Sequence, residues 1–193
     1  NISMTPTQIS IDPVQNVGVV NTASGAVGYL TFNEHIATAE QELIDAITTL
    51  KDSNVTDLVL DLRYNSGGLT YLASQLAYMI AGPDATSDRT FFLRQWNDKH
   101  PSFHPVKWND KHPSFHPVTG AALALPFIYW EVDTVLARRW NQVIEPLPYL
   151  DLPRVYVLTT SETCSASEAI MNGLRGIDIE VIQIGGTTCG KPY

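Results

Sequence analysis

VTDLVLDLRYNSGG, residues 55–68, is a mostly apolar run of strand length that ends in two glycines. The stretch that follows it, LTYLASQLAYMIAG (69–82), is strongly apolar and ends on Gly82, as many helices do. A strand that is apolar along most of its length is typical of a buried, parallel sheet. This strand, turn and helix therefore predict one unit of an α/β fold.

The same alternation of strand and helix is found on both sides of this unit. On the N-terminal side, AVGYLTF (26–32) has the pattern of a strand, and ATAEQELIDAITTLKD (37–52) has that of an amphipathic helix. On the C-terminal side, VYVLTT (155–160) predicts a strand, residues 165–175 a helix, and EVIQIGG (180–186) a further strand. We therefore expect an α/β fold with a largely parallel β-sheet flanked by helices.

Composition excludes several classes of partner. The chain of 193 residues is 44% hydrophobic, which is enough for one domain with a real core. Its net charge of -8 argues against a nucleic-acid partner, because phosphates require clusters of Lys and Arg. The longest apolar run, residues 121–130, is far shorter than the roughly 18 residues that span a bilayer. We expect no membrane-spanning segment.

The N-terminal end of the chain stands apart from this alternation. Residues 1–24 contain two short extended patches separated by Pro13, and we assign them to a linker or to the tail of an upstream module. We expect residues 25–193 to form the core domain. That core stops straight after a glycine–lysine–proline turn, so we expect it to be truncated at its C-terminal end.

A duplicated segment interrupts the middle of the chain, where WNDKHPSFHPV occurs at 96–106 and again at 108–118. Its histidines have the HxxxH spacing of some zinc sites, in which both imidazoles share one face of a helix. Each histidine, however, precedes a proline, which favours extended backbone and opposes that helix. We interpret the segment as a surface loop with one poorly ordered copy and no metal site. The four histidines are His100, His104, His112 and His116.

The turn after the strand 155–160 offers a candidate nucleophile within TCSASEAIMNGL (163–174). Ser165 and Glu168 have the spacing of a capping box, which by itself explains both residues as a helix start. A serine between a buried strand and a helix also lies where strand ends face a crevice, at a helix N-terminus that favours a developing oxyanion. From these residues alone both interpretations stay open.

Two further strand ends carry residues suited to acyl transfer. Lys191 follows the strand 180–186 and can serve as a base if its surroundings favour the neutral amine; otherwise it is an ordinary exposed loop lysine. Gly67 and Gly68 end the strand at 55–64, where backbone N–H groups can form half of an oxyanion hole or simply a turn. The three strand ends together are more informative than any one of them.

GYLTF, LVLDLRYNSGG, TCSASEAIMNGL and IGGTTCGKPY occur in an order and spacing that resemble those of the tail-specific, or C-terminal processing, serine peptidases. The resemblance implies a Clp-protease/crotonase-like core, commonly preceded by a PDZ domain, so the upstream module would be PDZ-like. It implies Ser165 as nucleophile and Lys191 as general base. It also implies an oxyanion hole from the N–H of Ala166 and that of Gly67 or Gly68.

The function that this resemblance implies is a serine endopeptidase with a Ser-Lys dyad. Its substrates would be unfolded or C-terminally apolar segments of proteins, cleaved through an acyl-enzyme without a metal or other cofactor. The resemblance also implies a bacterial protein exported to the periplasm or cell surface. In such a compartment Cys164 and Cys189, each close to a catalytic position, are candidates for a disulfide.

Two other functions fit the same fold. One is a non-catalytic module that binds a peptide or an apolar ligand, and the other is a crotonase-type enzyme that acts on acyl-thioesters. The joint presence of Ser165 and Lys191 favours the peptidase over both, because neither alternative needs the pair. His35, at the end of the first predicted strand, is a weaker alternative to Lys191 as the base.

Overall fold

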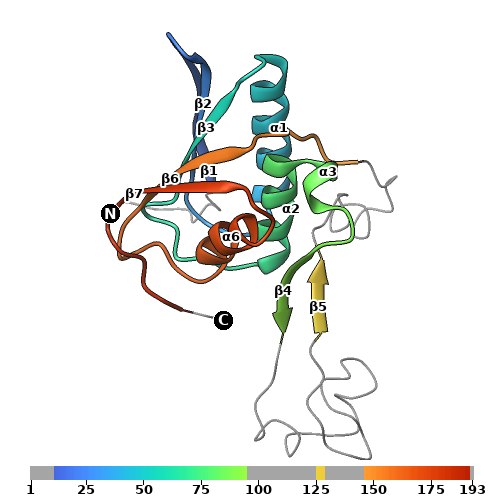
Figure 1. Cartoon of the computed structure of the whole chain (residues 1–193). Helices are drawn as coiled ribbons and strands as arrows, with labels where there is room; N and C mark the ends of the chain where they lie inside the picture. The colour runs from blue at the N-terminus through green and yellow to red at the C-terminus, as the bar shows by residue number, and fades with distance from the viewer. Residues whose placement is uncertain (1–10, 95–124, 129–145, 192–193) are drawn as a thin grey trace, which may run out of the picture.

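The computed structural model describes residues 11–94, 125–128 and 146–191, which form a five-stranded sheet, a two-stranded sheet and the helices that connect them (Figure 1). The duplicated segment and its four histidines lie outside the described residues. The expectations for that segment therefore stay predictions. None of the described helices combines the length and the apolar composition required to cross a membrane.

The main sheet has the strand order β1-β2-β3-β6-β7. β1 (Val14–Thr22) pairs antiparallel with β2 (Gly25–Phe32). β2, β3 (Asp57–Asp61), β6 (Arg154–Thr159) and β7 (Glu180–Gly185) all pair parallel to their neighbours. The prediction of a largely parallel sheet is confirmed, and every strand expected from the sequence is present.

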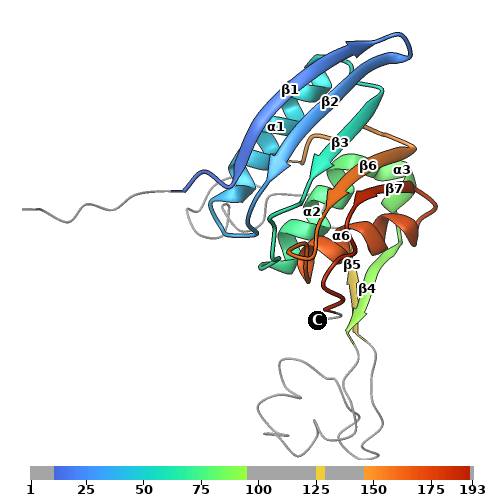
Figure 2. The same ribbon diagram turned by 90° about the vertical axis from the view of Figure 1, so that its left-hand side faces the viewer.

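The helices that connect the parallel strands lie on one face of the sheet, as Figure 2 shows. α1 (Ala39–Asp52) leads from β2 to β3, α2 (Thr70–Ala81) and the short α3 (Pro83–Thr86) follow β3, and α6 (Ala166–Arg175) leads from β6 to β7. Because crossovers between parallel strands are right-handed and the strands are added in one direction, all these helices reach the same face.

The hydrophobic core fills the space between this sheet face and the helices. Leu58 and Leu60 of β3 and Val157 of β6 are fully buried there. On the opposite face of the sheet, Arg154 of β6 donates to the buried Asp57 of β3 at 2.5 and 2.9 Å. β3 is therefore buried on both faces, with leucines on one and ion-paired aspartates on the other.

A small two-stranded sheet and the edge strand β1 add to this layered core. β4 (Thr90–Arg94) pairs antiparallel with β5 (Leu125–Ile128) in a separate small sheet. β1 lies in the segment that the sequence assigns to a linker or upstream module, yet its hydrogen bonds to β2 make it an edge strand of the main sheet. The division of the chain into modules is itself still a prediction.

Candidate active site

Ser165 occupies the turn between β6 and α6. Its φ is +54° and its ψ -113°, a backbone conformation that L side chains rarely adopt. It forms the predicted capping box with Glu168, whose Oε2 accepts the Ser165 N–H at 2.9 Å. Strained backbone of this kind persists only where its surroundings hold it, and it is concentrated at functional sites.

The glycine loop that follows β3 lies directly against this turn. Gly67 has a φ of +93°, and a Cβ added to it would lie 2.8 Å from Cβ of Ser165 and 2.7 Å from the carbonyl oxygen of Cys164. Both the conformation and the lack of space require glycine at this position. The loop after β3 and the turn after β6, both of which carry predicted site residues, are thus in contact.

Hydrogen bonds fix the glycine loop to the Ser165 turn. The carbonyl oxygen of Asn65 accepts the Cys164 N–H at 3.1 Å and the Ser167 hydroxyl at 3.0 Å. The buried Thr163 hydroxyl donates to the carbonyl oxygen of Leu62 at 2.7 Å. Each of these hydrogen bonds joins residues about a hundred positions apart in the sequence, and together they hold the end of β3 against the end of β6.

The two glycines expected to supply an oxyanion donor differ in what their N–H groups contact. The Gly67 N–H is already engaged, since it donates to Oδ1 of Asn65 at 2.9 Å. Gly68 forms an isolated parallel bridge with His35, in which the His35 N–H donates to the Gly67 carbonyl and the Leu69 N–H donates to the His35 carbonyl. Its own N–H therefore points away from His35. Ala166, as the first residue of α6, supplies a second N–H of the helix N-terminus.

His35 packs against the glycine loop and contacts it through Asn65. Its side chain is buried, and Nδ1 lies 2.9 Å from Oδ1 of Asn65, whose Nδ2 donates to the Phe32 carbonyl at 2.8 Å. Because Oδ1 is thereby the acceptor, Nδ1 of His35 carries the proton. Burial lowers the pKa of His35 to about 4, although its hydrogen bond to Asn65 opposes the shift. His35 is thus a neutral side chain engaged with the loop.

The backbone N–H groups of Lys191 and Ser165 share one acceptor, the carboxylate of Glu168. The Lys191 N–H donates to Oε2 of Glu168 at 2.9 Å, the same oxygen that accepts the Ser165 N–H. Its side chain is exposed, and within the described residues its amine makes no hydrogen bond to the Ser165 hydroxyl. Lys191 is expected to act as a base only where its surroundings favour the neutral amine, and its role as the base stays a prediction.

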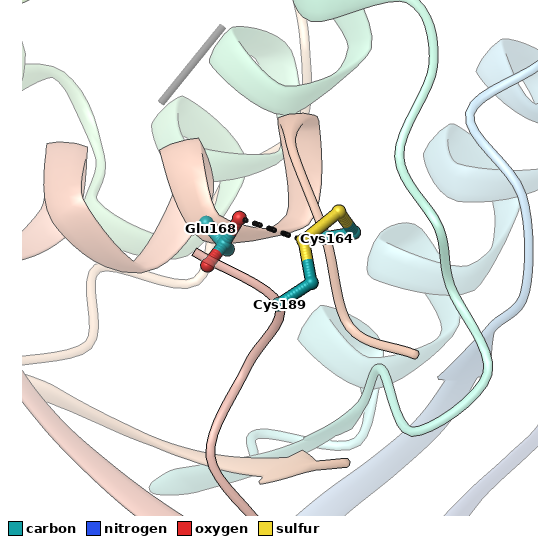
Figure 3. A group of neighbouring side chains, drawn as sticks. All are labelled: Cys164, Glu168 and Cys189. Atoms are coloured by element: carbon teal, nitrogen blue, oxygen red, sulfur yellow. Dashed lines mark hydrogen bonds between the residues drawn. A yellow bond between two sulfur atoms is a disulfide. The ribbon is translucent and has the colours of Figure 1, made fainter. Parts of the chain in front are cut away.

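A disulfide joins the segments that carry Ser165 and Lys191 (Figure 3). Cys164 and Cys189 are bonded through sulfur with their Cα atoms 5.2 Å apart, so the expected pairing is present. Glu168 lies beside the bridge, and ligand atoms of the three residues are within 4.8 Å of one another. Because the two sulfur atoms are bonded to each other, these residues are not a free set of metal ligands.

The residues that connect the site carry no sequence signal for that role. The sequence predicts Glu168 as a helix cap, but its contacts with residues 188–191 have no local signal because they join segments that are distant along the chain. Asn65 lies within the recognised NSGG turn, yet its role as the central acceptor of the loop depends on the approach of β6. The general rule that a buried polar group needs a hydrogen-bond partner predicts that such contacts exist, but it does not say which residues make them.

A mostly parallel sheet with helices packed on one face, and a serine turn held against a glycine loop, place this chain among α/β proteins with a Clp-protease/crotonase-like core. More specifically, residues 26–193 match the sequence model of peptidase family S41. The chain belongs to this family. A search of curated proteins finds no match.

Solved structures show the same fold. A putative S41 protease from Bacteroides fragilis is 26% identical with a TM-score of 0.65, and the match covers 96% of this chain and 41% of that one. The photosystem II D1 C-terminal processing protease is 19% identical with a TM-score of 0.58, covering 96% and 39%. Mature CPAF complexed with lactacystin is 16% identical with a TM-score of 0.51, covering 90% and 41%. The chain thus spans about two fifths of the length of these structures.

Proposed function

We propose that the protein is a serine endopeptidase in which Ser165 is the nucleophile and Lys191 the general base. Membership of peptidase family S41 supports the class of reaction. The observation that carries the assignment is the turn of Ser165, which is held at a φ of +54° between a buried strand and a helix N-terminus, with Gly67 against its Cβ. Acyl transfer requires a hydroxyl beside backbone amides, and the conformation of this turn supports that role for Ser165.

The reaction would proceed through an acyl-enzyme. The neutral amine of Lys191 takes the proton of Ser165 Oγ as that oxygen attacks the peptide carbonyl carbon. The N–H groups of Gly68 and Ala166 stabilise the oxyanion, and the lysine ammonium returns the proton to the leaving amine. Water then attacks the ester and releases Ser165. The exposed Lys191 side chain has to turn towards Ser165 for this step, and its flexible four-carbon stem permits such a movement.

We further propose that the substrates are unfolded or C-terminally apolar protein segments, bound as an added strand. We also propose that the protein acts outside the cytoplasm, in the periplasm or at the surface of a bacterium. The disulfide between Cys164 and Cys189 supports that location, because such bridges persist in oxidising compartments.

The dyad is tested by substitution in the intact protein, with casein as a disordered substrate and a fluorophosphonate as a serine label. Ser165→Ala is expected to abolish labelling and to lower peptide-bond cleavage by about a thousand-fold or more. Lys191→Met is expected to lower cleavage to a similar extent, since both residues act in one step. Ser161→Ala, an exposed serine of the same turn, is the matched control and is expected to behave as the wild type.

Full cleavage by either the Ser165 or the Lys191 variant would refute the dyad. If the wild type binds casein but neither cleaves it nor reacts with the fluorophosphonate, the non-catalytic binding module is the better description.

A further inference from the structure

Glu168 makes more contacts than a helix cap requires. Its Oε2 accepts the N–H of Ser165 and the N–H of Lys191, each at 2.9 Å. Its Oε1 accepts the Gly190 N–H at 2.8 Å and the Thr188 hydroxyl at 2.7 Å. A capping box accounts for the first of these four donors alone. The other three come from a segment 20 to 23 residues further along the chain.

The carboxylate keeps its charge in this position although it is largely buried. Burial raises the pKa of Glu168, but the hydrogen bonds from Thr188 and from the Ser165, Gly190 and Lys191 amides outweigh it and hold the pKa below its usual range. No cation pairs with this carboxylate in the part of the chain that the structure describes. Hydrogen bonds to an ionised acceptor are stronger than neutral ones, so the attachment is firm.

The disulfide connects the same two segments a few ångströms away. It links Cys164, which precedes Ser165, to Cys189, which lies two residues before Lys191. Figure 3 shows the Glu168 carboxylate turned towards the bridge, with Oε2 3.5 Å from the Cys189 sulfur. The disulfide and the Glu168 carboxylate thus hold the backbone of residues 189–191 in one position relative to the Ser165 turn.

We propose that Glu168 and the Cys164–Cys189 disulfide form a clamp that holds the Lys191 segment on the Ser165 turn, which makes Glu168 a positioning residue of the site. The inference rests on the proposed Ser-Lys function. The Glu168 carboxylate accepts the N–H of Ser165 and, among the described residues, makes no hydrogen bond to the reacting hydroxyl. It fixes the backbone from which the lysine amine has to reach the serine hydroxyl, and a displacement of about 1 Å in such a site lowers the rate by up to about a hundredfold.

The test measures kcat and KM separately for a fluorogenic peptide with an apolar C-terminus, in the intact protein. Glu168→Gln replaces one acceptor oxygen by an NH₂ group that faces N–H donors. We expect kcat to fall about 10- to 100-fold while KM changes less than about twofold, because the substrate contacts are retained. Glu162→Gln, an exposed glutamate in the same turn, is the matched control and should leave both constants unchanged.

Thr188→Val provides a second measurement if Glu168→Gln does not fold. It removes one donor to Oε1 at nearly constant shape, and we expect kcat to fall about three- to fivefold with KM unchanged. An unchanged kcat in the folded Glu168 or Thr188 variant, in a protein that Ser165→Ala inactivates, overturns the role of Glu168. Activity that survives Ser165→Ala instead refutes the proposed function itself.

The disulfide arm uses a small dithiol, which reduces the bridge to two thiols with two electrons and is itself oxidised to a disulfide. We expect kcat of the folded, reduced protein to fall about tenfold and to recover on reoxidation. Cys164→Ser/Cys189→Ser should have the lower kcat from the start and should not respond to the dithiol. A reduced protein with full kcat overturns the part of the clamp assigned to the disulfide.

Discussion

A single buried imidazole holds the glycine loop beside Ser165. Nδ1 of His35 donates to Oδ1 of Asn65, which also accepts the Gly67 N–H, so one amide oxygen connects the imidazole to the loop. Within the described residues Nε2 of His35 has no hydrogen-bond partner. Protonation would place a charge in a site that offers no second acceptor, which explains why burial lowers the pKa of His35 to about 4.

This lowered pKa predicts a loss of stability in mild acid. The imidazole of the unfolded chain binds a proton near pH 6.5, whereas that of the folded chain does so only near pH 4. The contribution of neutral His35 is therefore complete above pH 6.5 and is lost as the pH falls towards 4. Between pH 7 and pH 4.5 this amounts to about 2 to 3 kcal/mol of unfolding free energy.

Urea denaturation of the wild type and of His35→Gln at both pH values measures this effect. At pH 7 the variant should be the less stable protein, because glutamine replaces a packed imidazole. At pH 4.5 the difference should shrink by about 2 to 3 kcal/mol, since glutamine does not titrate. The remaining histidines and the carboxylates are common to both proteins and cancel. An identical pH dependence of the two proteins would show that His35 is not the group responsible.

At the scale of elements, the packing of α6 depends on a glycine inside the helix. Gly173 faces β4, and a Cβ added to it would lie 2.2 and 2.5 Å from two ring carbons of Phe91. Phe91 is itself buried. The helix therefore uses glycine here to admit an aromatic ring, at the cost in helix propensity that glycine carries.

Gly173→Ala is expected to destabilise the protein, although the same change in an exposed helix stabilises it by about 1 kcal/mol. The added methyl must displace the Phe91 ring, and such overpacking costs about 1 to 3 kcal/mol. The check is a double-mutant cycle followed by urea denaturation. In a Phe91→Leu background the clash is relieved, so Gly173→Ala should become neutral or stabilising. A destabilisation of equal size in both backgrounds would exclude the ring as its cause.

The elements themselves are predictable from local pattern, and their contacts are not. A mostly apolar run of strand length predicts the strand at 55–64, and a strongly apolar run ending on Gly82 predicts the helix at 69–82; β3 and α2 lie within them. Ser165, Gly67 and Gly68 were identified because they end strands of one sheet. The exposure of the Lys191 side chain and the hydrogen bonds from Cys164 and Ser167 to the Asn65 carbonyl depend on how the strand ends meet, which no local pattern records.

At the scale of the whole molecule, the disulfide constrains the edge of the sheet that β7 forms, together with α6. Cys164 and Cys189 are 25 residues apart, and the loop between them contains α6 and β7. In the folded chain this region is also held by the core face of α6 and by the pairing of β6 with β7. In the unfolded chain the bridge is the restraint that remains, so its main effect is to lower the entropy of unfolding.

Loss of the bridge should therefore lower the free energy of unfolding by about 3 to 4 kcal/mol, the value that loop-closure entropy gives for a loop of this length. Urea denaturation of the oxidised wild type, the reduced wild type and Cys164→Ser/Cys189→Ser tests this directly. The last two should have similar midpoints, and only the wild type should respond to the reductant. Glu168 and its four donors remain in all three proteins, so the change in stability isolates the covalent link from the hydrogen bonds beside it. A loss below about 1 kcal/mol would mean that the unfolded chain already keeps these two segments together, because the bridge would then restrict little that is not already restricted.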